Sequence, residues 1–427
     1  MFKKIISLLS FASLITLLTL IIIFFIVDLN IFGLKVKLYN SFPNFELRKI
    51  ILKKDSKIEH FVNDYNVKFL PYTQFEKVNF TKKKIIFEND LISKNNNLDT
   101  SIAYKRYNSF YIDFYKDNLL LTDHIGNIYY IKKTKIFSLI KNLKAKNIKG
   151  NLNVSRVFDS FVYDDKIFVS FTSQEKDCNE INISYANINL ESLKFENFFS
   201  SNQCNKTGSP GRIQIFEKNG IKGLLVSTSE GIHDEPGNNT QNKDSIFGKI
   251  LFIPINEPNT IEIYSMGHRV IQGLSVNDGI VISTEHGPRG GDEINKILSN
   301  KNYGWPIVSL GERYDFKYKN NNLTYKKDHS RLNFEDPIFS FIPSIGISEI
   351  IKLPSDFSIY YDNHYLLSSL NGRSLYFIRF DQNFKKAVTI EKVFINKRIR
   401  DIKYLEDNNN IILALEENGE IGIISNN

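Results

Sequence analysis

The sequence predicts an all-β chain, a six-bladed β-propeller preceded by an N-terminal transmembrane helix. Short β-branched and aromatic runs recur along most of its 427 residues, and one long apolar run stands at the start. Helical periodicity is almost absent after that run, and hydrophobic residues make up 42% of the chain, enough for a large core. We therefore expect a membrane anchor over residues 1–30, a membrane-proximal extension of unknown fold over 31–101, and the propeller over 102–427.

The apolar run from Ile5 to Val27 carries no charge and is ended by Asp28. A helix needs about 20 residues to cross a bilayer, and this run is long enough. Lys3 and Lys4 precede it and favour a cytoplasmic N-terminus, which places the rest of the chain on the extracytoplasmic (periplasmic) side. A cleaved signal peptide is the alternative, but the run is long for one and lacks a small-x-small cleavage site.

The net charge of +8 comes from 55 basic and 47 acidic residues. The bases are scattered in short groups such as Lys82-Lys83-Lys84, without one long run or helical stripe. This distribution is typical of a solvated surface, so we expect no nucleic-acid partner. The partners we expect are the membrane, through the N-terminal apolar run, and a small molecule.

The chain has two cysteines, Cys178 and Cys204, in one polar stretch. In an oxidising compartment a bridge between them would close a modest loop and stabilise the fold by roughly 3 kcal/mol. Two unrelated thiols are the alternative, and two isolated cysteines make a poor metal site.

The propeller is predicted from a repeat in which a polar turn is followed by a buried strand, a second turn and often another strand. Most copies are roughly 40 to 60 residues apart, as propeller blades are. Six copies predict six small antiparallel sheets around a central axis, and a large β-sandwich is the alternative. A polar insertion from Gly311 to Asp336 explains the one wider gap. The copies begin at Asn118, Tyr163, Lys218, Asn277, Tyr361 and Glu406.

The most distinctive stretch is "STEHGPRGGDEINKILSNKNYGWP", residues 283–306, which contains the chain's only Trp. It follows "GHRVIQGLSV" from Gly267, and the chain also has "GRIQIF" from Gly211, "FGKILFIPI" from Phe247 and "RIRDIKYLEDNNNIILAL" from Arg398. In order and spacing these motifs, from about residue 104 to 424, resemble the soluble glucose/sorbosone dehydrogenase family. The resemblance implies a six-bladed propeller that oxidises sugars with pyrroloquinoline quinone and calcium.

A hard cation such as Ca²⁺ needs several oxygen ligands, and a Gly-Pro turn followed by two carboxylates offers them. The resemblance implies that the carbonyls of Gly287 and Pro288 hold the calcium that binds the quinone. It assigns Asp292, Glu293 and Tyr303 to a nearby structural ion site. The alternative is a well-packed turn with a solvated acidic pair.

The anionic quinone requires fixed cations, and arginine binds planar carboxylates through two parallel hydrogen bonds. The resemblance implies that Arg269 faces the quinone carbonyl and that Arg398 and Arg400 contact its carboxylates. Gln272 also fits the cofactor-binding motif.

The chain departs from the family at several positions. The histidine that serves the family as general base is replaced by Gly208, and the asparagine after the motif arginine is replaced by Val270. Asn371 stands where the family has a lysine, although Arg373 follows two residues later. Because a positioned base typically contributes a factor of about 100 to 10,000 in rate, these changes bear directly on activity.

Two functions therefore remain open from the sequence. The first is an exported, membrane-anchored sugar dehydrogenase with Arg269 and His286 as candidate catalytic residues, and with His233 as another candidate for the missing base. The second is a non-catalytic propeller that binds a glycan, peptide or protein partner.

Overall fold

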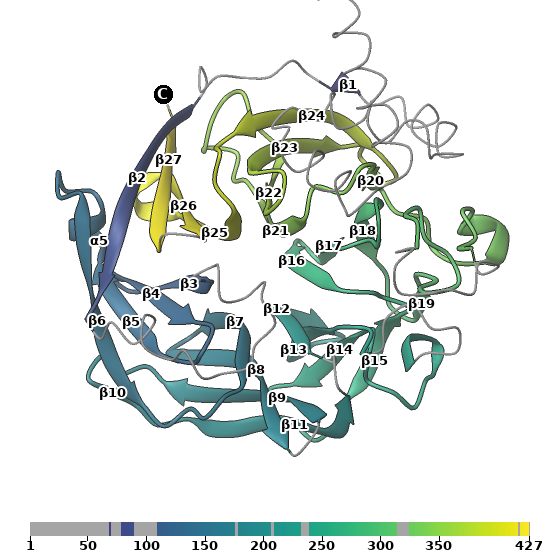
Figure 1. The fold of residues 1–427 in the computed structure, drawn as a ribbon, viewed down its shortest axis with the longest axis horizontal. Helices are drawn as coiled ribbons and strands as arrows, with labels where there is room; N and C mark the ends of the chain where they lie inside the picture. The colour runs from purple at the N-terminus through teal and green to yellow at the C-terminus, as the bar shows by residue number, and fades with distance from the viewer. Residues whose placement is uncertain are drawn as a thin grey trace, which may run out of the picture. The chain divides into compact units, whose positions relative to one another are not determined.

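The computed structural model describes residues 68–69, 78–88 and 109–426, except 176–177, 206–208, 232–238, 314–323 and 417–418. Its strands form six antiparallel groups of four, arranged in a ring (Figure 1). The prediction of an all-β propeller with six blades is therefore confirmed. Two of the blades share one nine-stranded sheet, because their outer strands pair with each other.

Each blade runs from an inner strand at the axis to an outer strand at the rim, and the blades follow one another around the ring in chain order. The first three consist of β3 (Phe110–Tyr115), β4 (Asn118–Asp123), β5 (Ile128–Lys132) and β6 (Asn142–Gly150); β7 (Arg156–Tyr163), β8 (Lys166–Glu175), β9 (Cys178–Asn187) and β11 (Glu196–Asn205); and β12 (Pro210–Lys218), β13 (Ile221–Thr228), β14 (Lys249–Pro254) and β15 (Glu262–Met266). The last three consist of β16 (Ile271–Asn277), β17 (Ile280–Glu285), β18 (Asp292–Ile297) and β20 (Phe339–Phe341); β21 (Ile347–Lys352), β22 (Tyr365–Ser369), β23 (Ser374–Phe380) and β24 (Ala387–Phe394); and β25 (Ile399–Leu405), β26 (Asn410–Leu415), β27 (Glu420–Asn426) and β2 (Val78–Phe87). The remaining short elements are β1 (Lys68–Phe69), α5 (Lys133–Ile136), β10 (Ser192–Leu193), η5 (Asn239–Gln241), β19 (Lys301–Asn302), η6 (Ser330–Leu332) and η7 (Glu406–Asn408).

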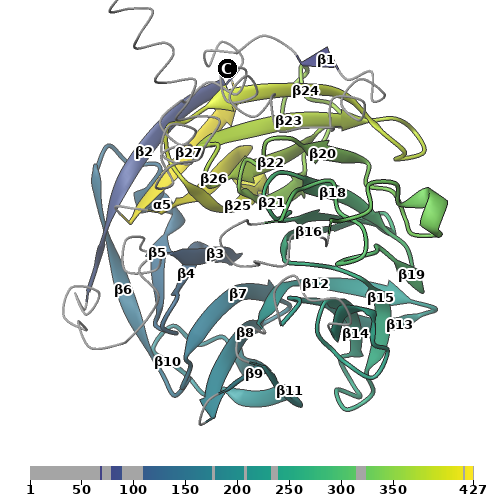
Figure 2. The same cartoon turned by 45° about the vertical axis from the view of Figure 1, so that its right-hand side comes forward.

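The ring is closed by its inner strands and held by apolar layers between blades. Neighbouring inner strands touch in chain order from β3 to β25, and β25 lies against β3 (Figure 2). Each main apolar cluster joins side chains of adjacent blades; for example, Leu225 of β13 packs with Val281 of β17. Burial of these alternating strand faces is the main force that holds the blades together.

The last blade contains a strand that the sequence pattern did not predict. The segment 31–101 was predicted to be an extension of unknown fold, yet β2 within it pairs antiparallel with β27, from Val78 opposite Asn426 to Lys84 opposite Glu420. It also pairs in parallel with β6 of the first blade. The two ends of the described chain thus complete one blade. The strand was missed because its Lys82-Lys83-Lys84 run interrupts the apolar alternation and its partners lie at the other end of the sequence.

Two predictions concern parts of the chain that the structure does not fully describe. The predicted anchor lies outside the described residues, and none of the helices within them is long and apolar enough to span a membrane. In the ladder between β9 and β11, Cys204 lies opposite Glu180, and the last pair is Asn205 with Asn179, the residue next to Cys178. The described residues contain no free cysteine. The side chain of Cys178 is not described, so the Cys178–Cys204 bridge stays a prediction.

Acidic side chains join the inner strands to one another along the propeller axis. Asp113 of β3 accepts the N–H of Val162 on β7 at 2.8 Å, and Asp159 of β7 accepts that of Ile213 on β12 at 2.9 Å. Asp401 of β25 accepts the N–H of Ile112 on β3 at 2.9 Å. Glu349 of β21 likewise accepts the N–H of Leu274 on β16 at 3.2 Å. These hydrogen bonds connect neighbouring blades at the centre of the ring.

Arg212 lies at the middle of this axial network and is almost fully buried. Its guanidinium contacts three carboxylates, those of Asp159 at 3.0 Å, Glu349 at 3.0 Å and Asp401 at 3.2 Å. It also donates to the carbonyls of Gln272 and Arg400, at 2.7 and 2.9 Å. One side chain therefore connects inner strands from five blades.

Candidate functional site

The arginines predicted to bind the quinone gather at one end of the propeller axis. Arg398 and Arg400 flank the start of β25, and Gln272 is near the start of β16. Arg400 Nη1 donates to the side-chain oxygen of Gln272 at 3.1 Å, although 128 residues separate them. The structure thus brings three of the predicted cofactor residues together.

One buried carboxylate orients both arginines. Glu416 follows β26 and accepts from Arg398 Nε at 2.9 Å and from Arg400 Nε at 2.7 Å. It also accepts from Ser109 Oγ at 2.6 Å. Burial alone would raise the pKa of Glu416, but the two guanidinium groups and the Ser109 hydroxyl lower it to about 2. The carboxylate is therefore ionised at neutral pH and fixes both cations.

We expect Glu416 to make the protein sensitive to acid. A carboxyl with a folded-state pKa of about 2, against an ordinary 4.5, contributes stability above pH 4.5 that is lost as the pH falls toward 2. The difference in free energy of unfolding between the wild type and Glu416→Gln, measured by urea denaturation, should therefore decrease as the pH falls from 4.5 toward 2. The exposed Glu257→Gln variant is the control, and its free energy of unfolding should stay within about 0.5 kcal/mol of the wild type. A difference for Glu416→Gln that stays constant would show that Glu416 is not held ionised.

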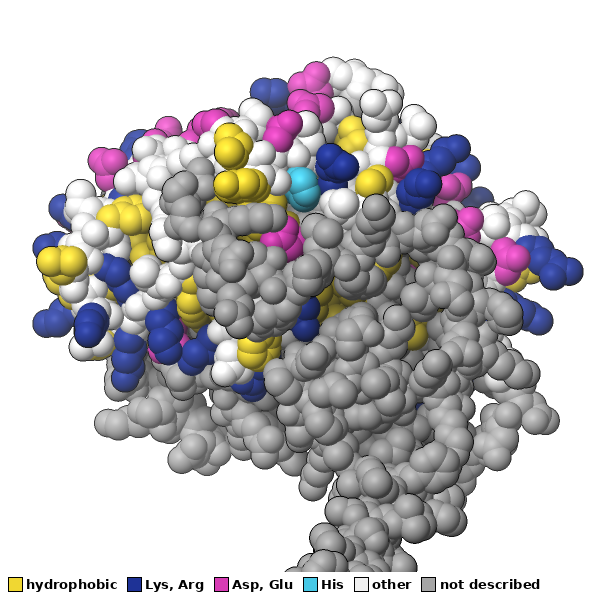
Figure 3. Space-filling view, turned by 90° about the horizontal axis from the view of Figure 1, so that it is seen from above, with side chains coloured by type: hydrophobic (Ala, Val, Ile, Leu, Met, Phe, Trp, Pro, Cys, Tyr) yellow, Lys and Arg dark blue, Asp and Glu magenta, His cyan; other side chains and the backbone are white. Residues whose placement is uncertain are grey.

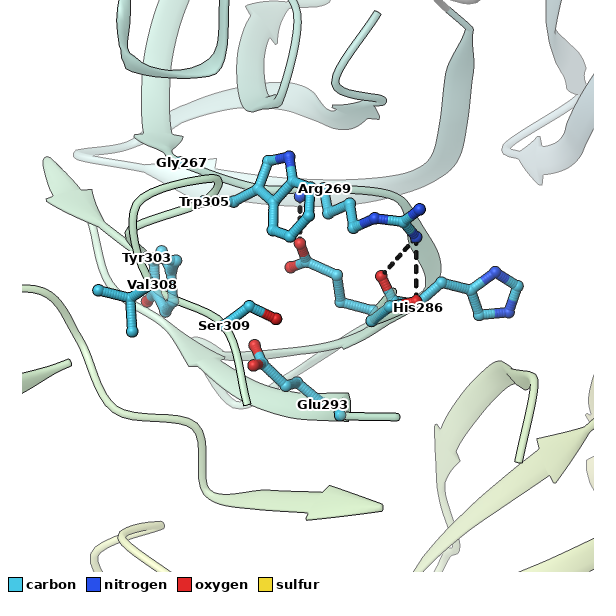
Figure 4. A pocket seen from close by; sticks show the side chains of 11 residues that line it. Gly267, Arg269, His286, Glu293, Tyr303, Trp305, Val308 and Ser309 are labelled. Atoms are coloured by element: carbon cyan, nitrogen blue, oxygen red, sulfur yellow. Dashed lines mark hydrogen bonds between the residues drawn. The ribbon is translucent and has the colours of Figure 1, made fainter. Parts of the chain in front are cut away.

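Arg269 lies beside these groups and lines a small pocket (Figure 4). Its Nη1 donates to the main-chain carbonyls of His286 and Gly287, both at 3.1 Å. Its Nε lies 3.7 Å from Glu230, and its guanidinium stands over the Trp305 ring at 5.2 Å. Arg269 is therefore held by the same loop that carries the predicted metal ligands. The pocket is lined by Gly267, Arg269, Glu285, His286, Gly287, Gly291, Glu293, Tyr303, Trp305, Val308 and Ser309.

Two acidic side chains face this pocket, and they have different surroundings. Glu285 accepts the backbone N–H of Arg269 and contacts His268 Nδ1 at 3.2 Å. Among the described residues, Glu293 has one weak hydrogen-bond partner, the Asn295 amide at 3.4 Å. Burial first, and then the nearby Glu285, raise the pKa of Glu293 to about 8. Glu293 is thus a poorly compensated carboxyl facing the pocket.

The structure corrects the prediction that Asp292 and Glu293 act as one pair. They are successive residues of β18, so their side chains point to opposite faces of the sheet. Both oxygens of Asp292 are already used: Oδ1 accepts the N–H of Gly287 at 3.1 Å, and Oδ2 accepts those of Ile345 and Ile347 at 3.0 Å each. Asp292 braces the loop and is not available as a side-chain partner of Glu293. The alternative of a solvated acidic pair is wrong as well, since Asp292 is buried.

Tyr303 lines the pocket, but its hydroxyl is engaged by the backbone of its own loop. Its hydroxyl donates to the Lys296 carbonyl at 2.6 Å and accepts the Leu298 N–H at 2.9 Å, and its ring stacks on His268. Pro288 is buried in the turn. Among the described residues, no three His, Cys, Asp or Glu side chains lie close enough to hold a metal ion. A cation here would therefore depend on Glu293 and on carbonyl oxygens.

His286 lines the same pocket, and its main-chain carbonyl accepts from Arg269. Its Nε2 lies 2.7 Å from the Ile347 carbonyl and must carry the proton, since that partner can only accept. Burial lowers the pKa of His286, and Arg269 and Arg400 lower it further, against the opposing effect of Asp292. The ring is therefore neutral near pH 7, with Nδ1 as its basic atom.

The positions at which the sequence predicted departures from the family lie partly outside the described residues. Gly208 and His233 are among the residues that are not described. Val270 precedes β16, and Asn371 lies with Arg373 in the turn between β22 and β23. Sequence reasoning missed Glu416, because "LEENGE" is indistinguishable from an acidic surface turn.

A family model supports the relationship that the motifs indicated. The model described as Glucose / Sorbosone dehydrogenase matches residues 107–423. The chain is 32% identical over 221 residues to the uncharacterized protein slr1608 of Synechocystis sp. and 30% identical over 165 residues to the aldose sugar dehydrogenase YliI of Escherichia coli. These alignments cover 46% and 38% of this chain, and 52% and 43% of the relatives, so the chain spans about half of their length.

Solved structures agree in fold over more of the chain. The apo-form of the soluble aldose sugar dehydrogenase of Escherichia coli has a TM-score of 0.62 at 20% identity, covering 75% of this chain and 96% of that one. The PQQ-bound aldose sugar dehydrogenase of Streptomyces coelicolor has a TM-score of 0.53 at 17% identity, covering 81% and 98%. At sequence identities this low, the similarity to these structures is evidence of a shared fold alone. From the family match over residues 107–423, this chain belongs to the glucose/sorbosone dehydrogenase family.

Proposed function

We propose that this protein is a sugar dehydrogenase that uses pyrroloquinoline quinone to oxidise an aldose. The observation that carries the proposal is the convergence of Arg398, Arg400 and Gln272 at one end of the axis, with Glu416 fixing both arginines. Membership of the family supports the reaction class. We further propose that the chain is exported and anchored by its N-terminal apolar run.

The donor set fits an anionic quinone. Arg398 and Arg400 would hold its carboxylates, with Gln272 as an additional hydrogen-bonding partner, and Arg269 would face its carbonyl. When bound, the quinone would accept a hydride, that is two electrons and one proton, from the sugar carbon. Calcium fits less completely: the Gly287 carbonyl already accepts from Arg269, although a carbonyl oxygen has a second lone pair for a cation.

His286 is the proposed acceptor of the sugar hydroxyl proton. The Ile347 carbonyl fixes its tautomer, so Nδ1 can take the proton that leaves as the C–H bond breaks. The neighbouring Arg269 and Arg400 disfavour a positive charge on the ring, so it is neutral before substrate arrives. In this scheme His286 replaces the base that Gly208 does not supply.

The proposal is tested by turnover. The full-length protein is loaded with pyrroloquinoline quinone and calcium, and reduction of an electron-accepting dye is followed with a panel of aldoses. We expect sugar-dependent reduction in the wild type and its loss in Arg269→Ala. Dye reduction that is independent of sugar, or unchanged in the variant, would contradict the proposal.

A propeller that binds a glycan, peptide or protein without catalysis is the second candidate. It is favoured by the replacement of the family base by Gly208 and of the family lysine by Asn371. Saturable sugar binding without turnover in the loaded protein would support it over the dehydrogenase.

We expect calcium to stabilise the protein through Glu293. A site filled at about 100 times its dissociation constant adds roughly 2.7 kcal/mol to the free energy of unfolding. Glu293→Gln should remove this gain, because it replaces the poorly compensated carboxylate, while the exposed Glu217→Gln should keep it. Thermal unfolding with calcium, magnesium or chelator measures the effect, and magnesium should stabilise less because it requires stricter geometry. Equal melting with calcium and chelator would exclude an ion at Glu293.

A further inference from the structure

The outer edge of the propeller formed by β2, α5 and β6 exposes several large apolar side chains to solvent. Leu139 is 102% exposed, Ile140 46%, Ile86 44% and Phe137 36%. Three of them form one turn between α5 and β6, and β2 is bonded to this turn. The N–H of Lys84 donates to the Lys141 carbonyl at 3.0 Å, and Lys83 Nζ donates to the Ser138 carbonyl. We call Phe137, Leu139, Ile140 and Ile86 the apolar tip.

Lysines surround the apolar tip on the same outward surface. Lys84 pairs in register with Asn142, and Ile86 with Lys144, so the exposed side chains of the two strands form one stripe. Figure 3 shows basic side chains gathered around hydrophobic ones on the left edge, the side on which β2, α5 and β6 lie in Figure 1. The exposed lysines of the stripe and its adjoining turn are Lys82, Lys84, Lys141, Lys144 and Lys146.

The charge of this stripe is largely uncompensated. Lys82 lies 3.8 Å from Glu420, which also pairs with Lys397 at 2.8 Å. Lys84, Lys141, Lys144 and Lys146 form no ion pair with the described residues. The nearby Glu88 is engaged by the N–H of Asn147 at 3.0 Å. The edge is therefore positive, with hydrophobic side chains projecting from its centre.

We propose that this edge docks on an anionic lipid bilayer. Basic side chains at a membrane surface are attracted to anionic headgroups, while exposed Leu, Ile and Phe enter the acyl boundary. A nucleic acid would neutralise the lysines but would leave the fully exposed Leu139 without an apolar partner. The edge includes β2, the first strand of the propeller, and the predicted anchor precedes it in the chain.

A tryptophan reporter at position 139 tests the docking. Full-length Leu139→Trp is reconstituted in phosphatidylglycerol vesicles whose acyl chains carry bromine, a contact quencher of tryptophan. Ile359→Trp is the matched control, since Ile359 is 87% exposed and lies in a loop with Asp356 and Asp362. Both variants retain Trp305, which is buried and contributes equally. Both also retain the predicted anchor, so their difference reports contact of the edge and not attachment of the chain.

We expect a loss of emission for Leu139→Trp that Ile359→Trp does not show. The loss should diminish in neutral phosphatidylcholine vesicles and at about 1 M salt, where the Debye length is about 3 Å. It should also diminish when Lys84, Lys144 and Lys146 are changed to Glu in the Leu139→Trp background. Equal quenching of the two reporters would overturn the proposal, as would quenching that is insensitive to lipid charge.

Discussion

Replacing Arg212 by Met is expected to lower the free energy of unfolding by about 3–5 kcal/mol. The guanidinium is buried among Asp159, Glu349 and Asp401, and its removal leaves three buried carboxylates without their shared cation. A similar side-chain volume is kept, so the loss is mainly electrostatic. Equilibrium urea denaturation at neutral pH measures it.

The control for this variant is Arg379→Met, which changes an exposed arginine of β23. Its effect should stay within about 0.5 kcal/mol. A double variant, Arg212→Met with Glu349→Gln, should recover part of the lost free energy of unfolding. The reason is that the second change removes one of the buried carboxylates that the first change leaves without a cation. An Arg212→Met variant as stable as Arg379→Met would show that the axial network does not hold the blades together.

Replacing His286 by Gln is expected to reduce sugar oxidation about 100- to 10,000-fold, the contribution of a positioned general base. Quinone binding should be retained, because the arginines are fixed by Glu416 and not by His286. Steady-state dye reduction gives the rate, and a quinone titration gives the affinity. Burial lowers the pKa of His286 below its ordinary 6.5. In the pH–rate profile of the wild type, the loss of activity at acid pH should therefore occur below pH 6.5.

His364→Gln is the matched control, since His364 precedes β22 and its ring contacts Asp362 and Tyr361 in the turn of its own blade. It should leave turnover and its pH profile unchanged. A His286→Gln enzyme that keeps more than about a tenth of the wild-type rate, with the same acid limb, would assign the proton to another group.

The six blades could be predicted from the sequence, because the signals that define a blade lie close together in the chain. Each repeat carries its own turns and alternating strands, so periodicity predicts it without knowledge of the ring. The arginines and Gln272 could also be placed, because family motifs surround them. β2 could not, since the strand joins partners at the far end of the chain and its lysine run hides the pattern.

The electrostatic organisation of the site was beyond sequence reasoning. Arg212 and Asp401 are 189 residues apart, and each alone is indistinguishable from a surface charge in a strand. Asp292 and Glu293 appeared to be one ligand pair, but the strand at β18 turns them to opposite faces. Only the closed ring shows which charges meet and which are kept apart.

Titration of the full-length protein with pyrroloquinoline quinone in the presence of calcium tests the central claim most directly. We predict that one quinone binds per chain and that Arg398→Met with Arg400→Met weakens binding by at least about tenfold. This follows because a hydrogen bond to a charged group contributes about 1.5–3 kcal/mol. Circular dichroism should show that the variant keeps its strands. A wild-type protein that binds no quinone, or a variant that binds it equally well, would contradict the account.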